Sequence, residues 1–361
     1  MSDRWRLAGW LPALILLIGG ALPSSAPIAV ESTMDRYDGK VPGASWLVVK
    51  DGQILAMRAT GMADLEASVA ATTATNYRLA SISKQFTAAA ILLLVEDGKL
   101  RLDDRLRSWL PELPPATASI SLHQVLTHSS GLLDYEELMN DQADAQVSDQ
   151  DVLDILSQAN RLYFEPGSGY RYSNSGYVLL GLVIERASGQ RLPAYLKQHI
   201  FGPLGMHGTL LYEASHGPEV PHRAFGYSDS GNGWQRTDQS PTSATRGDGG
   251  IYSSVRDLAL WNAALDNNRL LSASSRELAS AEHSRIVGED WDGSYGYGWR
   301  LTGDTQWHSG ETIGFRNVIV RWPAQRLTVI ILSNRNDPEP YATALAVGQR
   351  ELDADRDAAL P

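Results

Sequence analysis

The stretch Arg78-Leu79-Ala80-Ser81-Ile82-Ser83-Lys84-Gln85-Phe86, with the apolar run Thr87 to Val95 that follows it, decides how this chain folds. Residues 88–95 leave no polar face, and a helix that is apolar on all sides belongs in the centre of a domain. Gly98 then stands at the position where helices commonly end. The sequence therefore predicts a central buried helix that begins close to Ser81.

Ser81 and Lys84 stand three residues apart at the start of this helix, so their side chains lie one turn apart on the same face. Desolvation disfavours the charged form of such a lysine and makes it a better proton acceptor, or a strong local field for a neighbour. The helix N-terminus adds free N–H groups suited to an oxyanion on an acyl group carried by Ser81. A plainer interpretation also fits, in which Ser81 caps the helix and Lys84 is solvated.

The length of 361 residues allows one large domain or two smaller ones. Because 43% of the residues are hydrophobic, the protein can bury a sizeable core and is globular. The formal net charge is -11 and the pI is about 5.2. Since no basic run accompanies this acidity, we expect no nucleic-acid partner. The absence of cysteine excludes disulfides and a lipoprotein anchor.

The first 26 residues have the pattern of a secretory signal. Arg4 and Arg6 precede a mostly apolar run from Leu7 to Leu22, and small residues follow. We expect export, to the periplasm, with one catalytic domain over residues 27–361. The alternative is an uncleaved signal that anchors the protein to the membrane.

Strand patterns occupy both ends of the chain, and helical patterns occupy the middle. Strand-like runs pair over residues 45–58, 297–309 and 317–332. Helical spacing marks residues 120–126, 149–158, 177–186, 192–200, 257–265 and 341–352, whereas 216–250 is a loop without periodicity. We predict an α+β fold, with an antiparallel sheet built from about 27–80 and 285–361, flanked by helices, and a mostly helical insertion over about 81–284.

Two further stretches carry polar groups suited to acyl transfer. Tyr172 and Asn174 place a phenol and a carboxamide two residues apart, in a loop ahead of a helix. His308, Ser309 and Gly310 end a strand, where the glycine lets another backbone or a substrate approach closely. Read singly, Tyr172 also fits a packing aromatic, Asn174 a helix cap and His308 a surface residue.

The order Ser-x-x-Lys, Tyr-x-Asn and His-x-Gly at these positions resembles the three-motif signature of the serine β-lactamase and penicillin-binding protein superfamily. The Tyr-Ser-Asn form resembles the class C branch, with its esterases, DD-peptidases and D-aminopeptidases. The resemblance runs from about Pro42 to Ser333 and implies the β-lactamase/transpeptidase-like fold. Four smaller stretches also look like that branch: 126–132, 200–206, 249–253 and 295–299.

The resemblance implies a role for each matching residue. Ser81 would be the acylated nucleophile, and Lys84 and Tyr172 would form a proton relay for it. Asn174 would bind the amide carbonyl of the substrate's acyl side chain. The backbone N–H groups of Ser81 and Glu311 would form the oxyanion hole.

The third motif bears on the substrate. The resemblance implies that His308 belongs to the catalytic group and that Ser309 and Gly310 bind substrate. Class C β-lactamases carry lysine where this chain has His308, and histidine is mostly neutral at pH 7. Hydrolysis of a peptide, amide or ester is therefore favoured over efficient β-lactamase action. Candidates to bind a substrate carboxylate are Arg300, Arg316 and Arg246.

The functional prediction is a serine hydrolase that forms an acyl-enzyme on a D-amino-acid-containing peptide or a small ester, with peptidoglycan-derived peptides among the candidate substrates. No cofactor or metal is implied. A true class C-like β-lactamase stays open, as does a non-catalytic penicillin-recognising or cell-wall binding module on the same fold. The α/β-hydrolase class is excluded because no Gly-x-Ser-x-Gly elbow occurs. A metal hydrolase is disfavoured because the eight histidines form no His-Glu-x-x-His pattern.

Overall fold

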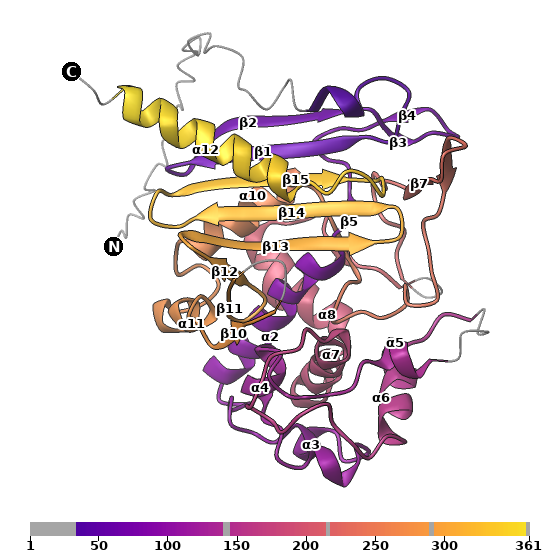
Figure 1. Ribbon diagram of the computed structural model, residues 1–361, viewed down its shortest axis with the longest axis vertical. Coiled ribbons are helices and arrows are strands. Elements are labelled where there is room, and N and C mark those ends of the chain that lie inside the picture. The colour runs from indigo at the N-terminus through magenta and orange to yellow at the C-terminus, as the bar shows by residue number, and fades with distance from the viewer. Residues whose placement is uncertain (1–33, 140–144, 214–216, 289–291, 359–361) are drawn as a thin grey trace, which may run out of the picture.

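The computed structural model describes residues 34–139, 145–213, 217–288 and 292–358. The expected signal segment, residues 1–26, lies outside the described residues. Within them, no helix has the length and apolar character that a membrane span requires. The predicted α+β architecture is confirmed, because a large antiparallel sheet has helices packed on both faces (Figure 1).

The large sheet is assembled from both ends of the chain, as predicted. Its eight strands are β1 (Ala44–Lys50), β2 (Gln53–Thr60), β10 (Ser284–Ile286), β11 (Gly293–Tyr295), β12 (Arg300–Thr302), β13 (Thr305–Thr312), β14 (Phe315–Trp322) and β15 (Leu327–Ser333). Their order is β10-β11-β12-β13-β14-β15-β1-β2. Strand β15 pairs with β1, from Ser333 opposite Ala44 to Leu327 opposite Lys50, so the N-terminal hairpin continues the C-terminal strands (Figure 1).

Successive side chains of the long strands face opposite layers. One face packs under α12 (Tyr341–Ala358), where the rings of Trp307 and Tyr341 stack with centroids 4.0 Å apart. The other face, with Ile330, packs against the helical region, which includes α10 (Val255–Leu265). The catalytic candidates lie where this second face meets the helices.

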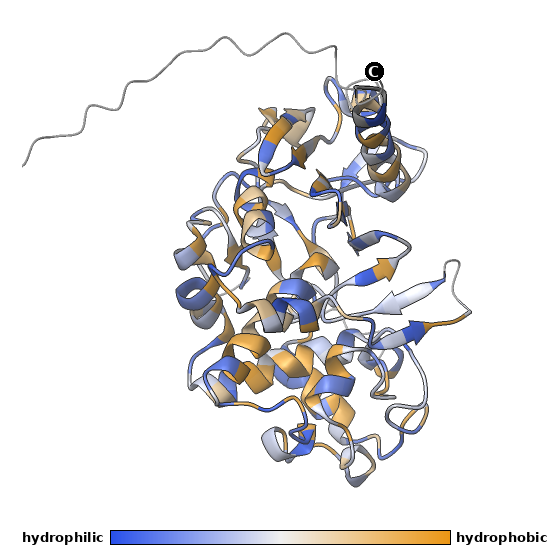
Figure 2. Cartoon of the chain, turned by 90° about the vertical axis from the view of Figure 1, so that its left-hand side faces the viewer, coloured by the Kyte–Doolittle hydropathy of each residue, from blue (hydrophilic) through white to orange (hydrophobic). Residues whose placement is uncertain are grey.

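Helix α2 (Ser83–Glu96) is the central buried helix that the sequence predicts, and every residue from Ser83 to Leu92 is buried. The short 3₁₀ helix η2 (Ala80–Ile82) leads directly into it and carries Ser81. Helix α7 (Asn174–Ser188) packs alongside α2. Figure 2 shows apolar residues concentrated on the helices of this region.

The remaining helical elements are short, and all but η1, which packs on the α12 side of the sheet, belong to the helical region around α2 and α7. They are η1 (Asp35–Tyr37), α3 (Leu106–Trp109), η3 (Pro115–Thr117), α4 (Leu122–Leu126), α5 (Tyr135–Leu138), α6 (Asp149–Ser157), α8 (Leu192–Leu196), the π-helical η4 (Lys197–Phe201), α9 (Gly202–Leu204) and α11 (Ala273–Ala279). The helix predicted over 192–200 is therefore α8 continued by a π turn.

Three small sheets add strands that the sequence patterns do not reveal. They are β3 (Met62–Asp64) with β4 (Val69–Ala70), β5 (Tyr77–Arg78) with β9 (Ile251–Ser253) and β6 (Leu210–Leu211), and β7 (Tyr227–Asp229) with β8 (Trp234–Arg236). The described part of the predicted loop 216–250 thus contains a hairpin. Strands of two or three residues are too short to show an alternating pattern.

Candidate active site

Ser81 is presented by a sharp change of direction between β5 and α2. Strand β5 is held in its small sheet by β9, and the N–H of Leu79 donates to the carbonyl of Ile251 at 2.8 Å. The next residue, Ala80, has φ +49°, a value that residues other than glycine seldom adopt. Backbone conformations of this kind collect at functional sites, where the surrounding structure holds them in place. The turn leaves the Ser81 side chain half-buried at the wall of a cavity.

The structure brings Ser81, Lys84 and Asn174 into direct contact. Lys84 is fully buried. Its Nζ donates to Ser81 Oγ at 3.2 Å, to Asn174 Oδ1 at 2.8 Å and to the main-chain carbonyl of Asp248 at 3.1 Å. Three acceptors match the three N–H groups of an ammonium. The hydroxyl of Ser81 therefore lies beside a buried and fully hydrogen-bonded amine.

Tyr172 lies against the same lysine, with its ring centroid 4.9 Å from Lys84 Nζ. The Tyr172 ring also packs against His128, whose ring centroid is 4.3 Å from that of Tyr172. His128 Nδ1 accepts a hydrogen bond from the N–H of Ser173 at 3.1 Å. Burial, together with the charge of Lys84, holds the pKa of His128 well below its usual value, so the ring is neutral. His128 thus orients the Tyr172 segment by packing and one hydrogen bond.

Asn174 is the first residue of α7, and the helix is capped by Ser173, whose Oγ accepts from the N–H of Gly176 at 3.1 Å. The Asn174 side chain is therefore available to the site. One of its Nδ2 protons goes to Glu136 Oε1 at 3.0 Å. A carboxamide has two such protons, so Nδ2 can donate a second hydrogen bond.

His308 is buried behind this group, 1% exposed, with its ring centroid 6.1 Å from that of Tyr172. Its Nδ1 lies 2.6 Å from the carbonyl of Ser309, which can only accept, so Nδ1 carries the proton. Nε2 then accepts from the hydroxyl of Tyr295 at 3.0 Å. Burial and the nearby Arg300 hold the pKa of His308 well below its usual value. The third motif therefore supplies a neutral ring at this point.

The strand β13 is pressed against η2. A Cβ on Gly310 would lie 2.0 Å from the carbonyl oxygen of Leu79, so only glycine allows this approach. The buried Asn317 on β14 joins the two segments, because its Nδ2 donates to the carbonyl of Arg78 at 2.8 Å and to that of Gly310 at 3.2 Å. Glu311 follows Gly310 and lines the same cavity as Ser81.

That cavity has a volume of about 260 Å³. Of the residues proposed from sequence, Ser81, Asn174 and Glu311 line it. Arg78, Glu136 and Asp248 also line it, and sequence reasoning missed all three in this role. No motif marks them. The only signal was that Asp248 adjoins the stretch 249–253, which resembles the family.

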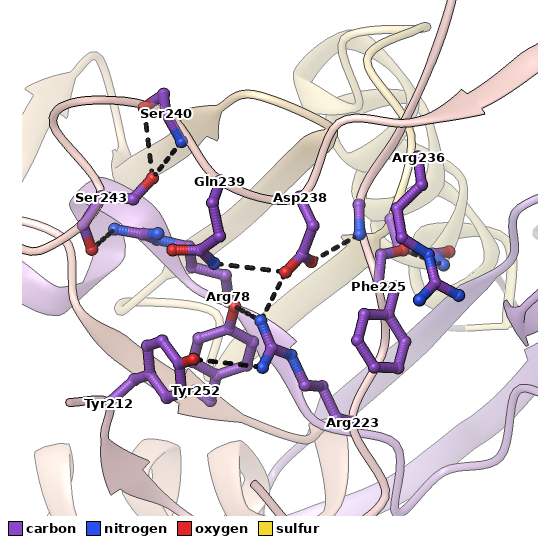
Figure 3. A network of polar contacts seen from close by, with 12 residues as sticks. Arg78, Tyr212, Arg223, Phe225, Arg236, Asp238, Gln239, Ser240, Ser243 and Tyr252 are labelled. Carbon is purple, nitrogen blue, oxygen red and sulfur yellow. Dashed lines mark hydrogen bonds and ion pairs between the residues drawn. The ribbon is translucent and has the colours of Figure 1, made fainter. Parts of the chain in front are cut away.

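The loop that carries Asp248 is anchored by two buried or half-buried arginines (Figure 3). Arg78 donates through Nη2 to the carbonyl of Ser243 at 2.9 Å and through Nε to that of Gly249 at 3.4 Å. Arg223 forms an ion pair with Asp238 at the start of the same loop. These contacts fix the wall of the cavity opposite β13.

None of the three arginines considered for a substrate carboxylate is among the described residues that line the cavity. Arg246 forms ion pairs with Asp149, Glu185 and Glu213 at 2.8, 3.3 and 3.6 Å, which makes it a structural centre. Arg316 donates to the carbonyls at positions 312 and 315. The guanidinium of Arg300 lies 5.3 Å from the Tyr172 ring centroid.

Comparison with known proteins identifies relatives over most of the chain. Residues 29–354 match the Beta-lactamase protein family. The chain is 33% identical over 317 residues to penicillin-binding protein 4* of Bacillus subtilis, which covers 83% of this chain and 69% of that relative. It spans 61% of the length of the Staphylococcus aureus protein Flp, at 28% identity.

Two solved structures share the fold. One is the octameric penicillin-binding protein homologue from Pyrococcus abyssi, with a TM-score of 0.76 and 30% identity over 88% of this chain and 77% of that one. The other is the D-amino acid amidase from Ochrobactrum anthropi SV3, determined with L-phenylalanine amide, with a TM-score of 0.78 and 25% identity over 92% of this chain and 97% of that one.

Proposed function

The chain belongs to the Beta-lactamase family, and on that basis we propose that it is a serine hydrolase that cleaves an amide, peptide or ester bond through an acyl-enzyme on Ser81. The observation that carries the proposal is the contact of Ser81 Oγ with the buried Lys84 Nζ at 3.2 Å, at the wall of a cavity. A hydroxyl is a weak nucleophile until a neighbouring group accepts its proton.

Acylation would begin with attack of Ser81 Oγ on the substrate's carbonyl carbon. The hydroxyl proton passes to the Tyr172 phenolate, which the neighbouring Lys84 ammonium stabilises. The N–H groups of Ser81 and Glu311 donate to the oxyanion that forms, and each donor of this kind commonly contributes about 3 kcal/mol to transition-state stability. Collapse of the intermediate breaks the bond to the leaving group, which takes the proton from Tyr172.

Deacylation would use the same groups, with water as the nucleophile and Ser81 Oγ as the leaving group. A water molecule gives its proton to Tyr172 as its oxygen attacks the acyl carbon, and the oxyanion again accepts from the two N–H groups. The bond between the acyl carbon and Ser81 Oγ then breaks, and Oγ takes the proton back. The products are a carboxylic acid and the free enzyme.

The substrate that we propose is a D-amino-acid-containing peptide or amide, or a small ester. Support comes from the similarity to a D-amino acid amidase and to penicillin-binding proteins. The cavity supports a small acyl group, because about 260 Å³ lies just below the usual range of ligand pockets. Efficient β-lactamase action is disfavoured, since His308 is neutral and no arginine from the candidate set lines the cavity.

The test is intact-protein mass spectrometry of wild type and Ser81→Ala after incubation with a fluorescent penicillin and, separately, with a p-nitrophenyl ester. We expect an adduct or ester turnover in wild type and neither in the variant. A stable penicillin adduct identifies a DD-peptidase-like enzyme, and rapid loss of the adduct identifies a β-lactamase. Labelling of Ser81→Ala at the wild-type level would refute the assignment, and inactivity of wild type in both assays would favour the non-catalytic module.

We also propose that residues 1–26 direct export to the periplasm, which cell fractionation tests together with the N-terminal sequence of the mature protein. Recovery of the intact chain in the membrane fraction would favour the uncleaved anchor instead. Recovery in the cytoplasmic fraction would contradict export.

A further inference from the structure

Two carboxylates beside Ser81 lack a cationic partner. Glu136 and Asp248 both line the cavity that Ser81 faces. Asp248 is 7% exposed, and its Oδ1 is buried with no hydrogen-bond partner among the described residues. Burying a carboxylate without a partner is costly, and such orphaned groups in native structures call for a functional explanation.

Neighbouring carboxylates in the described part of the chain do have such partners. Glu137 pairs with Arg171 at 2.6 Å. Glu136, one residue earlier, accepts only from the neutral amide of Asn174, at 3.0 Å. Glu311, the third carboxylate that lines the cavity, lies 3.7 Å from Arg316. Of the carboxylates that line the cavity, Glu136 and Asp248 are thus the two without an ion pair among the described residues.

Lys84 lies close to the two carboxylates but forms no hydrogen bond with either of them. Its three hydrogen bonds go to Ser81 Oγ, Asn174 Oδ1 and the main-chain carbonyl of Asp248, and none goes to a carboxylate. Arg78, which also lines the cavity, donates to the main-chain carbonyls at positions 243 and 249. Neither cation therefore donates to the side chain of Glu136 or Asp248 among the described residues, so both carboxylates can still accept from a group that enters the cavity.

The electrostatics of Glu136 agree with this geometry. Burial raises the pKa of its carboxyl, and the charges of Asp134 and Asp248 raise it further, whereas the Asn174 hydrogen bond and the charge of Lys84 oppose the shift. Glu136 is exposed and Asp248 is buried, and two carboxylates that repel each other attract a cation between them. A cation bound between them would relieve both the repulsion and the missing hydrogen bond at Asp248.

We propose that Glu136 and Asp248 form a subsite for an ammonium group on the acyl side of the substrate. The proposal rests on the proposed function, since Glu136 is hydrogen-bonded to Asn174, the residue expected to hold the acyl side chain. The substrates selected are amides or esters of amino acids, or peptides with a free amino terminus, whose ammonium lies one carbon from the scissile carbonyl. Substrates that present a carboxylate at this position are rejected.

The first test compares two substrates of the same shape, D-alanine p-nitroanilide and isobutyric p-nitroanilide, in which a methyl group replaces the ammonium. The assay is run at pH 6.5, where an α-amino group is protonated. We expect wild type to prefer the alanine substrate by about tenfold or more in kcat/KM, and Asp248→Asn and Glu136→Gln each to lower this ratio by about three- to tenfold. The L-alanine substrate shows whether the preference depends on chirality.

Glu137→Gln is the matched control, because it removes the same charge one residue away, at a position that is exposed like Glu136 but lies outside the cavity lining. Its substrate ratio is expected to equal that of wild type. Equal kcat/KM of wild type for the two substrates would overturn the subsite. An equal fall in kcat/KM for both substrates in Asp248→Asn and Glu136→Gln would also overturn it. That pattern would mean that the two carboxylates act only by positioning Lys84.

A second measurement separates the subsite from the proposed chemistry. Calorimetry with Ser81→Ala measures binding of D-alaninamide and isobutyramide without turnover. Tighter binding of D-alaninamide by about tenfold, lost in Ser81→Ala combined with Asp248→Asn, supports the subsite even if wild type hydrolyses neither anilide. Equal or undetectable binding of both amides overturns the subsite, whereas acylation of Ser81 by an ester would still support the proposed function.

Discussion

Replacing Asn317 by leucine is expected to slow catalysis although Asn317 touches no substrate. Asn317 is fully buried, and its Nδ2 donates to the carbonyl of Gly310 at 3.2 Å. The peptide bond from Gly310 to Glu311 is trans, so its carbonyl and the Glu311 N–H point in opposite directions from one plane. A hydrogen bond to the carbonyl therefore also fixes the direction of the N–H proposed for the oxyanion hole.

The size of the effect follows from these contacts. Loss of a whole oxyanion donor commonly lowers kcat by about 10²- to 10³-fold. Asn317→Leu turns the Glu311 N–H away without removing it, so we expect a smaller fall in kcat, about 10- to 100-fold, with KM little changed. The carbonyls of Arg78 and Gly310 are left without this donor, and each unsatisfied buried group costs about 1–3 kcal/mol of stability.

The assay is steady-state hydrolysis of a p-nitrophenyl ester, combined with thermal unfolding. Asn334→Leu is the control, because Asn334 is equally buried and also donates to backbone carbonyls, those of Met62, Ala63 and Phe225, outside the cavity lining. We expect a comparable loss of thermal stability in the control with kcat within about threefold of wild type. Equal kcat in the two variants would refute the role of the peptide plane. Asn317→Gln, which keeps a side-chain amide donor, should be faster than Asn317→Leu.

Three further predictions follow from the same contacts. Lys84→Met, which keeps the length but removes the donor to Ser81, is expected to lower the acylation rate by about 10²- to 10⁴-fold; a loss below tenfold in a rapid-mixing assay would exclude Lys84 from the proton relay. Gly310→Ala places a Cβ 2.0 Å from the Leu79 carbonyl and should cost about 1–3 kcal/mol in chemical denaturation as well as activity; a variant as stable as wild type would contradict the tight approach of β13 to η2. Because burial holds the pKa of His128 and His308 well below 6.5, the unfolded chain binds more protons than the folded one below that pH. The free energy of unfolding should therefore fall as the pH drops from 6.5, measured in denaturant titrations, and His308→Gln should reduce that slope; an unchanged slope would show that His308 titrates normally.

Much of the fold could be predicted because its signals are local. The turn Asp51-Gly52 is a strong hairpin signal between two strand-like runs, and it does join β1 to β2. The apolar run of residues 88–95 predicts a buried element, and Gly98 at the usual helix C-terminal position favours the helix α2. The hairpin β7-β8 escaped prediction because each of its strands has three residues, which is too short for an alternating pattern.

The candidate site likewise contains residues that the sequence could reveal and residues that it could not. Ser81 and Lys84 share one helical turn, so their contact at 3.2 Å could be expected from spacing alone. Asn317 gives no such signal, because it stands in a strand of apolar residues and its partners are main-chain carbonyls distant in sequence. Glu136 could not be recognised either, since only the fold brings it to Asn174.

The specificity of this site therefore depends on parts of the chain that carry no catalytic motif. The groups proposed for the chemistry lie on η2, α2 and β13 and at the start of α7, where buried residues fix the backbone. Asp248 comes instead from a loop whose position depends on Arg78 and Arg223 (Figure 3). Because loops tolerate substitution better than core elements, a change at position 248 can alter which acyl group is accepted while the Ser81–Lys84 contact is kept. A family match alone consequently says more about the proposed chemistry of Ser81 than about its substrate, which we propose the charge of this cavity wall selects.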